Sequence, residues 1–186
     1  STRLAVEQLR QPGGFNKNPD VHIELPGNLG KAARAMKMLG KGKQVKALED
    51  SMNSAAEAAI PEAQALLLEA IQNMTISDAK SILNGPSNSA TAYLDHSSRA
   101  QLRQRFRPLV AQATQSSGLA QKYNQFAGQA ASYGVIDSQD ASIENYVTEQ
   151  ALDGLFTIIG QQESAIRQNP AQAATDIAKK VFGLMR

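Results

Sequence analysis

Two carboxylates that share one predicted helix face are the strongest candidates for chemistry in this sequence. Glu149 and Asp153 lie four residues apart, which places both on one side of a helix, and paired carboxylates can serve as general acid and base. An earlier segment carries arginines at the same spacing, Arg99, Arg103 and Arg107. Because a carboxylate near apolar residues needs a partner, we predict structural ion pairs between the two segments. The alternative is that these side chains form a binding site for an anionic ligand.

Two further patterns contain the residue types of nucleophilic enzymes but lack their context. Ser77 and Lys80 match the S-x-x-K pattern, in which a lysine activates a serine, yet the companion K-T-G motif is absent. Asp95, His96 and Ser98 are neighbours in a predicted helix, where their side chains diverge and cannot line up as a triad. We therefore expect Ser77 to cap a helix and His96 to lie at the surface.

Metal ligation has little support in the sequence. The chain has no cysteine, and its two histidines, His22 and His96, are far apart, which argues against a transition-metal site. Asp137, Asp140 and Glu144 gather around a predicted turn, but they lack the glycine and the ligand spacing of an EF-hand loop. We expect no metal site and no cofactor.

The composition is that of one globular domain. Of the 186 residues, 42% are hydrophobic and 19% are charged, which is sufficient for a single core without disulfides. We therefore treat residues 1–186 as a single helical domain. No apolar run approaches the roughly 20 residues that span a bilayer, so no transmembrane segment is expected.

The net charge is only +2, but the charges are unevenly distributed. Residues 31–46 contain six basic residues and no acid, whereas residues 123–166 contain six acids and no Lys or Arg. The basic stretch could contact phosphates or lipid headgroups, or it could be the solvated face of an ordinary amphipathic helix. Because it lacks aromatic residues for base stacking, nucleic acid is not an expected partner.

Hydrophobic periodicity predicts helices along almost the whole chain. Asn28 and Ser77 are the predicted N-caps of two of them, and Leu39 and Ile71 belong to predicted buried stripes. Pro61 either breaks or kinks a helix. The predicted helices cover about residues 2–11, 28–39, 44–59, 61–74, 77–83, 89–116, 119–131, 143–168 and 170–183.

One short segment departs from the helical pattern. Residues 21–25 alternate apolar and polar side chains, and since no partner strand is predicted, we expect them to dock on the core as extended coil. The predicted fold class is therefore an all-α, single-domain bundle of about eight helices with a short extended N-terminal segment.

The order of several motifs along nearly the whole chain resembles one bacterial family. They include IELPG at 23–27, AEAAIPEA at 56–63, ILNG at 82–85, FRP at 106–108, IENYVT at 143–148 and ALDGLF at 151–156. In these features the chain is similar to the domain-of-unknown-function family 4197. After Tyr93 that family usually carries an aromatic and basic residues, whereas Leu94, Asp95 and His96 follow here.

The resemblance has implications for location but not for activity. Members of the family look like exported proteins with an N-terminal signal segment. The resemblance therefore implies a periplasmic or envelope-associated location and removal of a signal peptide. The family has no established activity, so it supplies no catalytic residue for this chain.

Three classes of function follow, and the balance favours a protein that is not an enzyme. The first is a bacterial envelope protein that binds a hydrophobic or amphiphilic small molecule, such as a lipid, between helices, since small residues beside Leu and Met faces leave room for a cavity. The second is a structural or protein-interaction module without a pocket, which would have a protein partner. The third is an enzyme that uses the Glu149 and Asp153 carboxylates. The candidate ligand-binding residues are Arg107, Tyr123, Asn124, Tyr146 and Asp153.

Overall fold

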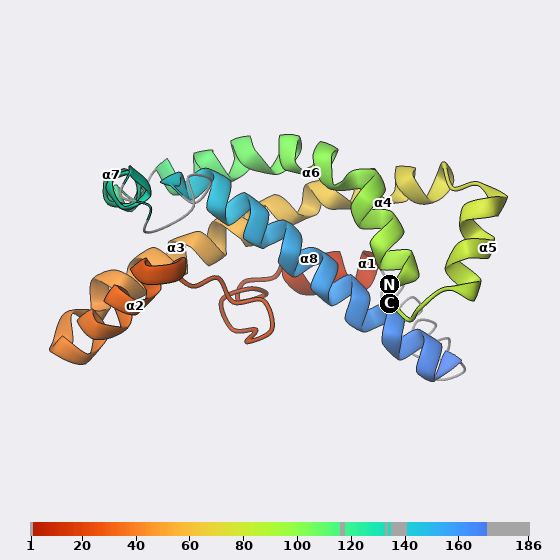
Figure 1. Cartoon of the computed structure of the whole chain (residues 1–186), viewed down its shortest axis with the longest axis horizontal. Helices are drawn as coiled ribbons and strands as arrows, with labels where there is room; N and C mark the ends of the chain where they lie inside the picture. Colours follow the sequence, from red (N-terminus) through yellow and green to blue (C-terminus); the bar gives the residue numbers. More distant parts are fainter. Residues whose placement is uncertain (1, 116–117, 133, 135–140, 171–186) are drawn as a thin grey trace, which may run out of the picture.

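All regular elements in the described structure are helices. The computed structural model describes residues 2–115, 118–132, 134 and 141–170 (Figure 1). In that part of the chain there is no β-strand, which confirms the predicted all-α class. The elements are α1 (Thr2–Leu9), α2 (Gly27–Met36), the π-helical turn η1 (Lys37–Lys41), α3 (Gly42–Ala59), the 3-10 turn η2 (Ile60–Glu62), α4 (Ala63–Gln72), α5 (Ile76–Asn84), α6 (Ser89–Gln115), α7 (Leu119–Ser132) and α8 (Ile143–Gln168).

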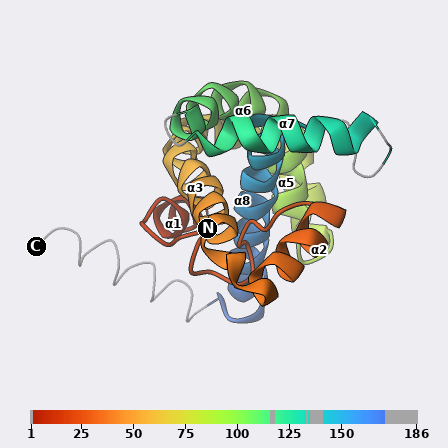
Figure 2. The ribbon, with the colours of Figure 1, turned by 90° about the vertical axis from the view of Figure 1, so that its left-hand side faces the viewer.

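The three longest helices supply the centre of the core. α6 packs against α8 and α3, and α7 crosses the end of this group, seen end-on in Figure 1 and from the side in Figure 2. Leu102 and Phe106 of α6 are fully buried, as are Leu152 and Leu155 of α8 and Met52 of α3. These residues recur every three or four positions, which is the spacing of a buried helix face.

The N-terminal segment docks on this core as coil, as its sequence predicts. Residues 22–26 form no regular element. The side-chain amide of Asn53 on α3 replaces a partner strand, because it accepts a hydrogen bond from the Ile23 N–H (2.9 Å) and donates one to the Ile23 carbonyl (2.9 Å). The Tyr146 hydroxyl on α8 donates to the Glu24 carbonyl at 2.6 Å. Two helices therefore hold the segment by its backbone.

A loop before this segment is held by a buried acid. One carboxylate oxygen of Glu57 accepts the backbone N–H groups of Gly13 (3.1 Å), Phe15 (3.0 Å) and Asn16 (3.2 Å). This arrangement satisfies three backbone donors with one anion, and it places the buried Phe15 ring against α8. A Cβ atom on Gly154 would lie 2.6 Å from that ring, so any larger residue at this crossing would force the buried ring to move.

The structure corrects two predicted helix caps. Thr75, not Ser77, caps α5: its hydroxyl accepts the Asp78 N–H at 3.1 Å, and the Asp78 carboxylate accepts the Thr75 N–H at 2.9 Å. This reciprocal capping box needs a spacing of three residues, which Ser77 inside the first turn cannot supply. Similarly, α2 begins at Gly27, so Asn28 lies within the helix and not at the N-cap position.

Two residues predicted to be buried are exposed. Leu39 is 79% exposed and Ile71 is 40% exposed. Leu39 does not continue the apolar face of α2, because α2 ends at Met36 and the following turn, η1, contains Gly40 at φ +80°. Ile71 lies one turn beyond the buried Leu67, where α4 approaches its end.

The remaining helix boundaries lie within two residues of the predicted ones or fall outside the described residues. Pro61 falls in η2, which separates α3 from α4. The predicted helix over residues 170–183 and the turn from Asp137 to Asp140 lie outside the described part of the chain.

Candidate functional site

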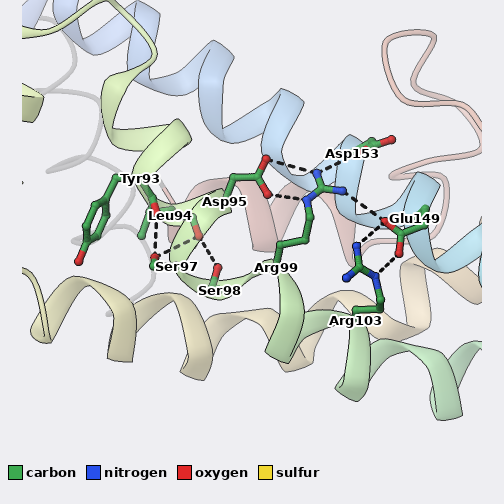
Figure 3. A network of polar contacts seen from close by, with 9 residues as sticks. All are labelled: Tyr93, Leu94, Asp95, Ser97, Ser98, Arg99, Arg103, Glu149 and Asp153. Carbon is green, nitrogen blue, oxygen red and sulfur yellow. Dashed lines mark hydrogen bonds and ion pairs between the residues drawn. The ribbon is translucent and has the colours of Figure 1, made fainter.

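The predicted ion pairs form between α6 and α8 (Figure 3). Arg99 of α6 binds Asp95 one turn earlier at 2.5 Å, and it reaches α8 at Asp153 (2.9 Å) and Glu149 (3.4 Å). Arg103 binds both carboxylate oxygens of Glu149. Five charged side chains from two helices therefore form one continuous network.

The surroundings of Glu149 favour the ionised state of its carboxylate. Hydrogen bonding from Arg103 lowers the pKa of Glu149 below its usual range, against the opposing effect of burial, and Arg99 lowers that pKa further. A carboxylate held in this way has no proton to donate near neutral pH. The network matches the predicted structural pairing of Glu149 and Asp153, and its geometry is that of a clamp between helices.

A cleft opens on one side of this network, between the same two helices. Its volume is about 630 Å³ and it is open to solvent. The residues that line it are Arg103, Gln104, Arg107 and Pro108 of α6 and Asn145, Thr148 and Glu149 of α8. Arg103 is neutralised by Glu149, but Arg107, one turn further along α6, makes no ion pair or hydrogen bond with any residue that the structure describes. Within the described region, Arg107 is therefore the member of the Arg99, Arg103 and Arg107 row that has no direct carboxylate partner.

Two polar groups of the residues that line the cleft lack a usual hydrogen-bond partner. Thr148 is 1% exposed, and its hydroxyl has no hydrogen-bond partner in the described structure. Pro108 has no N–H and so leaves the carbonyl of Gln104 without its usual helical donor. A buried hydroxyl without a partner costs free energy, and such groups recur at binding sites.

We expect Thr148→Val to raise the free energy of unfolding by about 1 kcal/mol, because it removes a buried unpaired hydroxyl and keeps the shape of the side chain. Urea unfolding followed by circular dichroism measures the change. Thr157→Val, at an exposed position of α8, is the matched control and should leave stability nearly unchanged. A loss of stability at Thr148 would mean that the hydroxyl has a partner after all.

The other predicted ligand-binding residues lie away from the cleft. The rings of Tyr123 and Tyr146 stack with centroids 6.5 Å apart, which joins α7 to α8. Asn124 accepts the Ile143 N–H at 2.8 Å at the start of α8 and lies beside Glu144. Among these residues, Asn124 and Tyr146 each line a different surface hollow, of about 610 Å³ and 580 Å³.

The five candidates therefore do not form one site. Arg107 alone lines the α6–α8 cleft, and Asp153 belongs to the network with Arg99. Sequence reasoning missed Asn145 and Thr148, which complete the cleft. The sequence indicated these two residues only weakly, because they are polar and lie within four positions of Glu149 on the same predicted helix.

The remaining patterns do not form sites in the described structure. The Ser98 hydroxyl is buried and donates to the Leu94 carbonyl at 2.6 Å, while His96 is exposed and Asp95 binds Arg99. Ser77 and Lys80 are both exposed. Within the described residues, no three His, Asp or Glu side chains are grouped so that they could hold a metal ion, and no helix is long and apolar enough to cross a bilayer.

Comparison with known proteins identifies the family and no closer relative. No curated protein and no solved structure is significantly similar to the chain. The family described as "Protein of unknown function (DUF4197)" matches residues 1–183, nearly the entire sequence, in agreement with the motifs noted above. The chain therefore belongs to the DUF4197 family.

Proposed function

We propose that this protein is a non-enzymatic binding protein of the bacterial envelope and that it holds the anionic group of an amphiphilic ligand, such as a lipid, in the α6–α8 cleft. The observation that carries the proposal is Arg107, which lines the cleft without a partner among the described residues. A guanidinium group binds a carboxylate or phosphate through two parallel hydrogen bonds. Asn145 and Thr148 line the cleft from α8.

The shape of the cleft favours a ligand with a charged end and an apolar remainder. The cleft is open rather than enclosed, so a charged headgroup can enter it while an alkyl chain lies along the surface past Pro108. In this proposal Asp153, Tyr123, Asn124 and Tyr146 are supporting residues, because they hold α6, α7 and the N-terminal segment against α8.

Two further parts of the proposal concern the domain and its location. We treat residues 1–186 as one domain because the buried residues of α1, α3, α4, α6 and α8 belong to one cluster. The envelope location is supported by the resemblance to exported proteins described above. Fractionation of bacteria that express an epitope-tagged copy tests it, and recovery in the cytoplasmic fraction would contradict it.

We expect Arg107→Gln to weaken the binding of dodecyl phosphate about tenfold, since it removes a charge-assisted hydrogen-bond pair. Isothermal titration calorimetry below the micelle concentration measures the affinity, with dodecyl maltoside as the uncharged comparison. Arg105→Gln is the matched control, because Arg105 is exposed on the same helix but does not line the cleft. Equal binding of both detergents, or equal losses for both variants, would contradict a role for Arg107.

The natural ligand can be sought directly. Native mass spectrometry of protein purified from its own envelope fraction should show a defined added mass, and solvent extraction should release an anionic amphiphile. A mass equal to that of the bare chain, together with no affinity for dodecyl phosphate, would oppose the proposal.

A second candidate function is a protein-interaction module. It is favoured by exposed apolar side chains on neighbouring helices, namely Leu68 of α4 and Ile76 and Leu83 of α5. Light scattering that shows a stable dimer, lost in Ile76→Ser/Leu83→Ser, would favour this module over the small-molecule binder.

A further inference from the structure

The turn between α2 and α3 projects two apolar side chains into solvent. Met38 is 89% exposed and Leu39 is 79% exposed, the highest values among the large apolar residues of the described chain. Both belong to η1, which lies at one extremity of the molecule, at the opposite end from α5 (Figure 1). We call residues 37–41 the tip.

The backbone of the tip keeps these side chains outside the fold. Gly40 has φ +80°, in the left-handed region that favours glycine, and a Cβ atom there would meet nothing within 4 Å. α2 itself is held to the body of the protein through the buried Leu29, which belongs to the main hydrophobic cluster. The apolar tip is therefore carried by a packed helix pair and extends beyond the core.

Basic residues flank the tip in the sequence. The six basic residues of positions 31–46 stand on both sides of Met38 and Leu39, with no acid between them. Arg34 pairs with Glu24 at 3.1 Å and Lys46 pairs with Asp50 at 2.6 Å. Lys31 and Lys43 are exposed and have no partner in the part of the chain that the structure describes.

We infer that the tip docks on the surface of an anionic lipid bilayer, with Met38 and Leu39 inserted among the acyl chains and the lysines at the headgroups. Apolar side chains at an exposed extremity flanked by cations have the chemistry of an interfacial anchor, and anionic lipids attract such basic segments. This inference goes beyond the ligand site, since it concerns a surface on other helices.

Other occupants fit the tip less well. A second copy that met this tip symmetrically would bring lysines against lysines, and like charges repel. Nucleic acid would use the cations but would leave Met38 and Leu39 without a role, and residues 31–46 contain no aromatic side chain for stacking. An anionic bilayer offers headgroups that attract the lysines and an apolar interior for Met38 and Leu39.

Vesicle sedimentation tests the docking surface. We expect the full chain to bind vesicles that contain phosphatidylglycerol and not vesicles of pure phosphatidylcholine, with binding weakened by salt. Met38→Ser/Leu39→Ser should lower the partition coefficient roughly tenfold or more, because two apolar side chains lose their burial. Ile76→Ser/Leu83→Ser is the matched control, compared at concentrations where light scattering shows both proteins as monomers: these residues are 78% and 76% exposed on α5, and their replacement should not change vesicle binding by the monomer.

The outcomes that would overturn the inference are distinct from failure of the ligand site. Met38→Ser/Leu39→Ser should bind dodecyl phosphate as the unmodified protein does, because neither residue lines the α6–α8 cleft, and this separates the two proposals. No binding to phosphatidylglycerol vesicles, unchanged binding of the tip variant, an equal loss in the α5 variant, or equally tight binding to double-stranded DNA would each overturn it.

A fluorescent probe measures insertion itself. The chain contains no tryptophan, so Leu39→Trp introduces a single indole at the tip with no background. We expect its emission to shift to shorter wavelength on addition of phosphatidylglycerol vesicles and to be quenched by brominated acyl chains. Leu83→Trp should show neither change, and an unshifted emission from Leu39→Trp in vesicle-bound protein would overturn the insertion.

Discussion

Glu163→Gln is expected to lower the free energy of unfolding by about 3 kcal/mol, because it breaks a buried charged contact that joins three helices. The carboxylate of Glu163 on α8 accepts the N–H groups of Ala90 (2.9 Å) and Thr91 (2.8 Å) at the start of α6, and the Thr91 hydroxyl at 2.7 Å. Arg167 binds the same carboxylate at 2.9 Å and donates to the Ile82 carbonyl of α5. Glutamine cannot accept all of these hydrogen bonds, because its side-chain NH₂ group would face groups that are themselves donors.

The same contact makes stability depend on pH in a predictable direction. Burial tends to raise the pKa of Glu163, but hydrogen bonds from Ala90, Thr91 and Arg167 outweigh it and lower that pKa below the ordinary value of 4.5. A lowered pKa contributes stability that is present above the ordinary value and is lost as the pH falls through the folded-state pKa. The difference between the unmodified protein and Glu163→Gln should therefore shrink as the solution is acidified below 4.5.

Urea unfolding at neutral and at acidic pH measures both effects. Glu69→Gln is the control, because Glu69 is exposed on α4 and has no partner in the described structure; it should change stability little at either pH. An equal effect of both variants at neutral pH would contradict the role of Glu163 as a cap on α6. A difference that does not shrink in acid would contradict its titration.

Asn53→Leu is expected to cost about 3 kcal/mol as well, because it leaves several buried backbone groups unpaired. Asn53 is fully buried, and its amide binds the Ile23 N–H and carbonyl and also donates to the Glu49 carbonyl at 2.8 Å. Leucine has a similar volume but no polar atom. The N-terminal segment should lose its docking site on α3 before the rest of the fold unfolds.

Hydrogen exchange distinguishes this local effect from a general loss of stability. The Ile23 amide should exchange much faster in Asn53→Leu, while amides in the middle of α8 should follow the global change only. Ser54→Ala, at the adjacent exposed position of α3, is the control and should leave the exchange of Ile23 unchanged. Protection of Ile23 in the leucine variant would show that another group holds the segment.

Local sequence patterns were sufficient for most helices of this protein. The predicted helix over residues 143–168 coincides with α8, and Ser89 begins α6 as predicted. Both follow from apolar side chains that recur at helical spacing, a property of neighbouring residues alone. The pairing of Glu149 and Asp153 with the arginine stripe was also predictable, since four-residue spacing on two helices presents one row of charges to the other.

Tertiary structure decided which of those residues have partners and which side chains face solvent. Arg99, Arg103 and Arg107 are equivalent in sequence, but the register of α6 against α8 pairs the first two and leaves the third in the cleft. Leu39 continues an apolar stripe in sequence, but the positive φ of Gly40 places it outside the core. Local patterns are enough to predict the helices and the rows of charge, because both depend on residues only a few positions apart. Register and burial depend on contacts between distant segments, so only the packed helices could decide them.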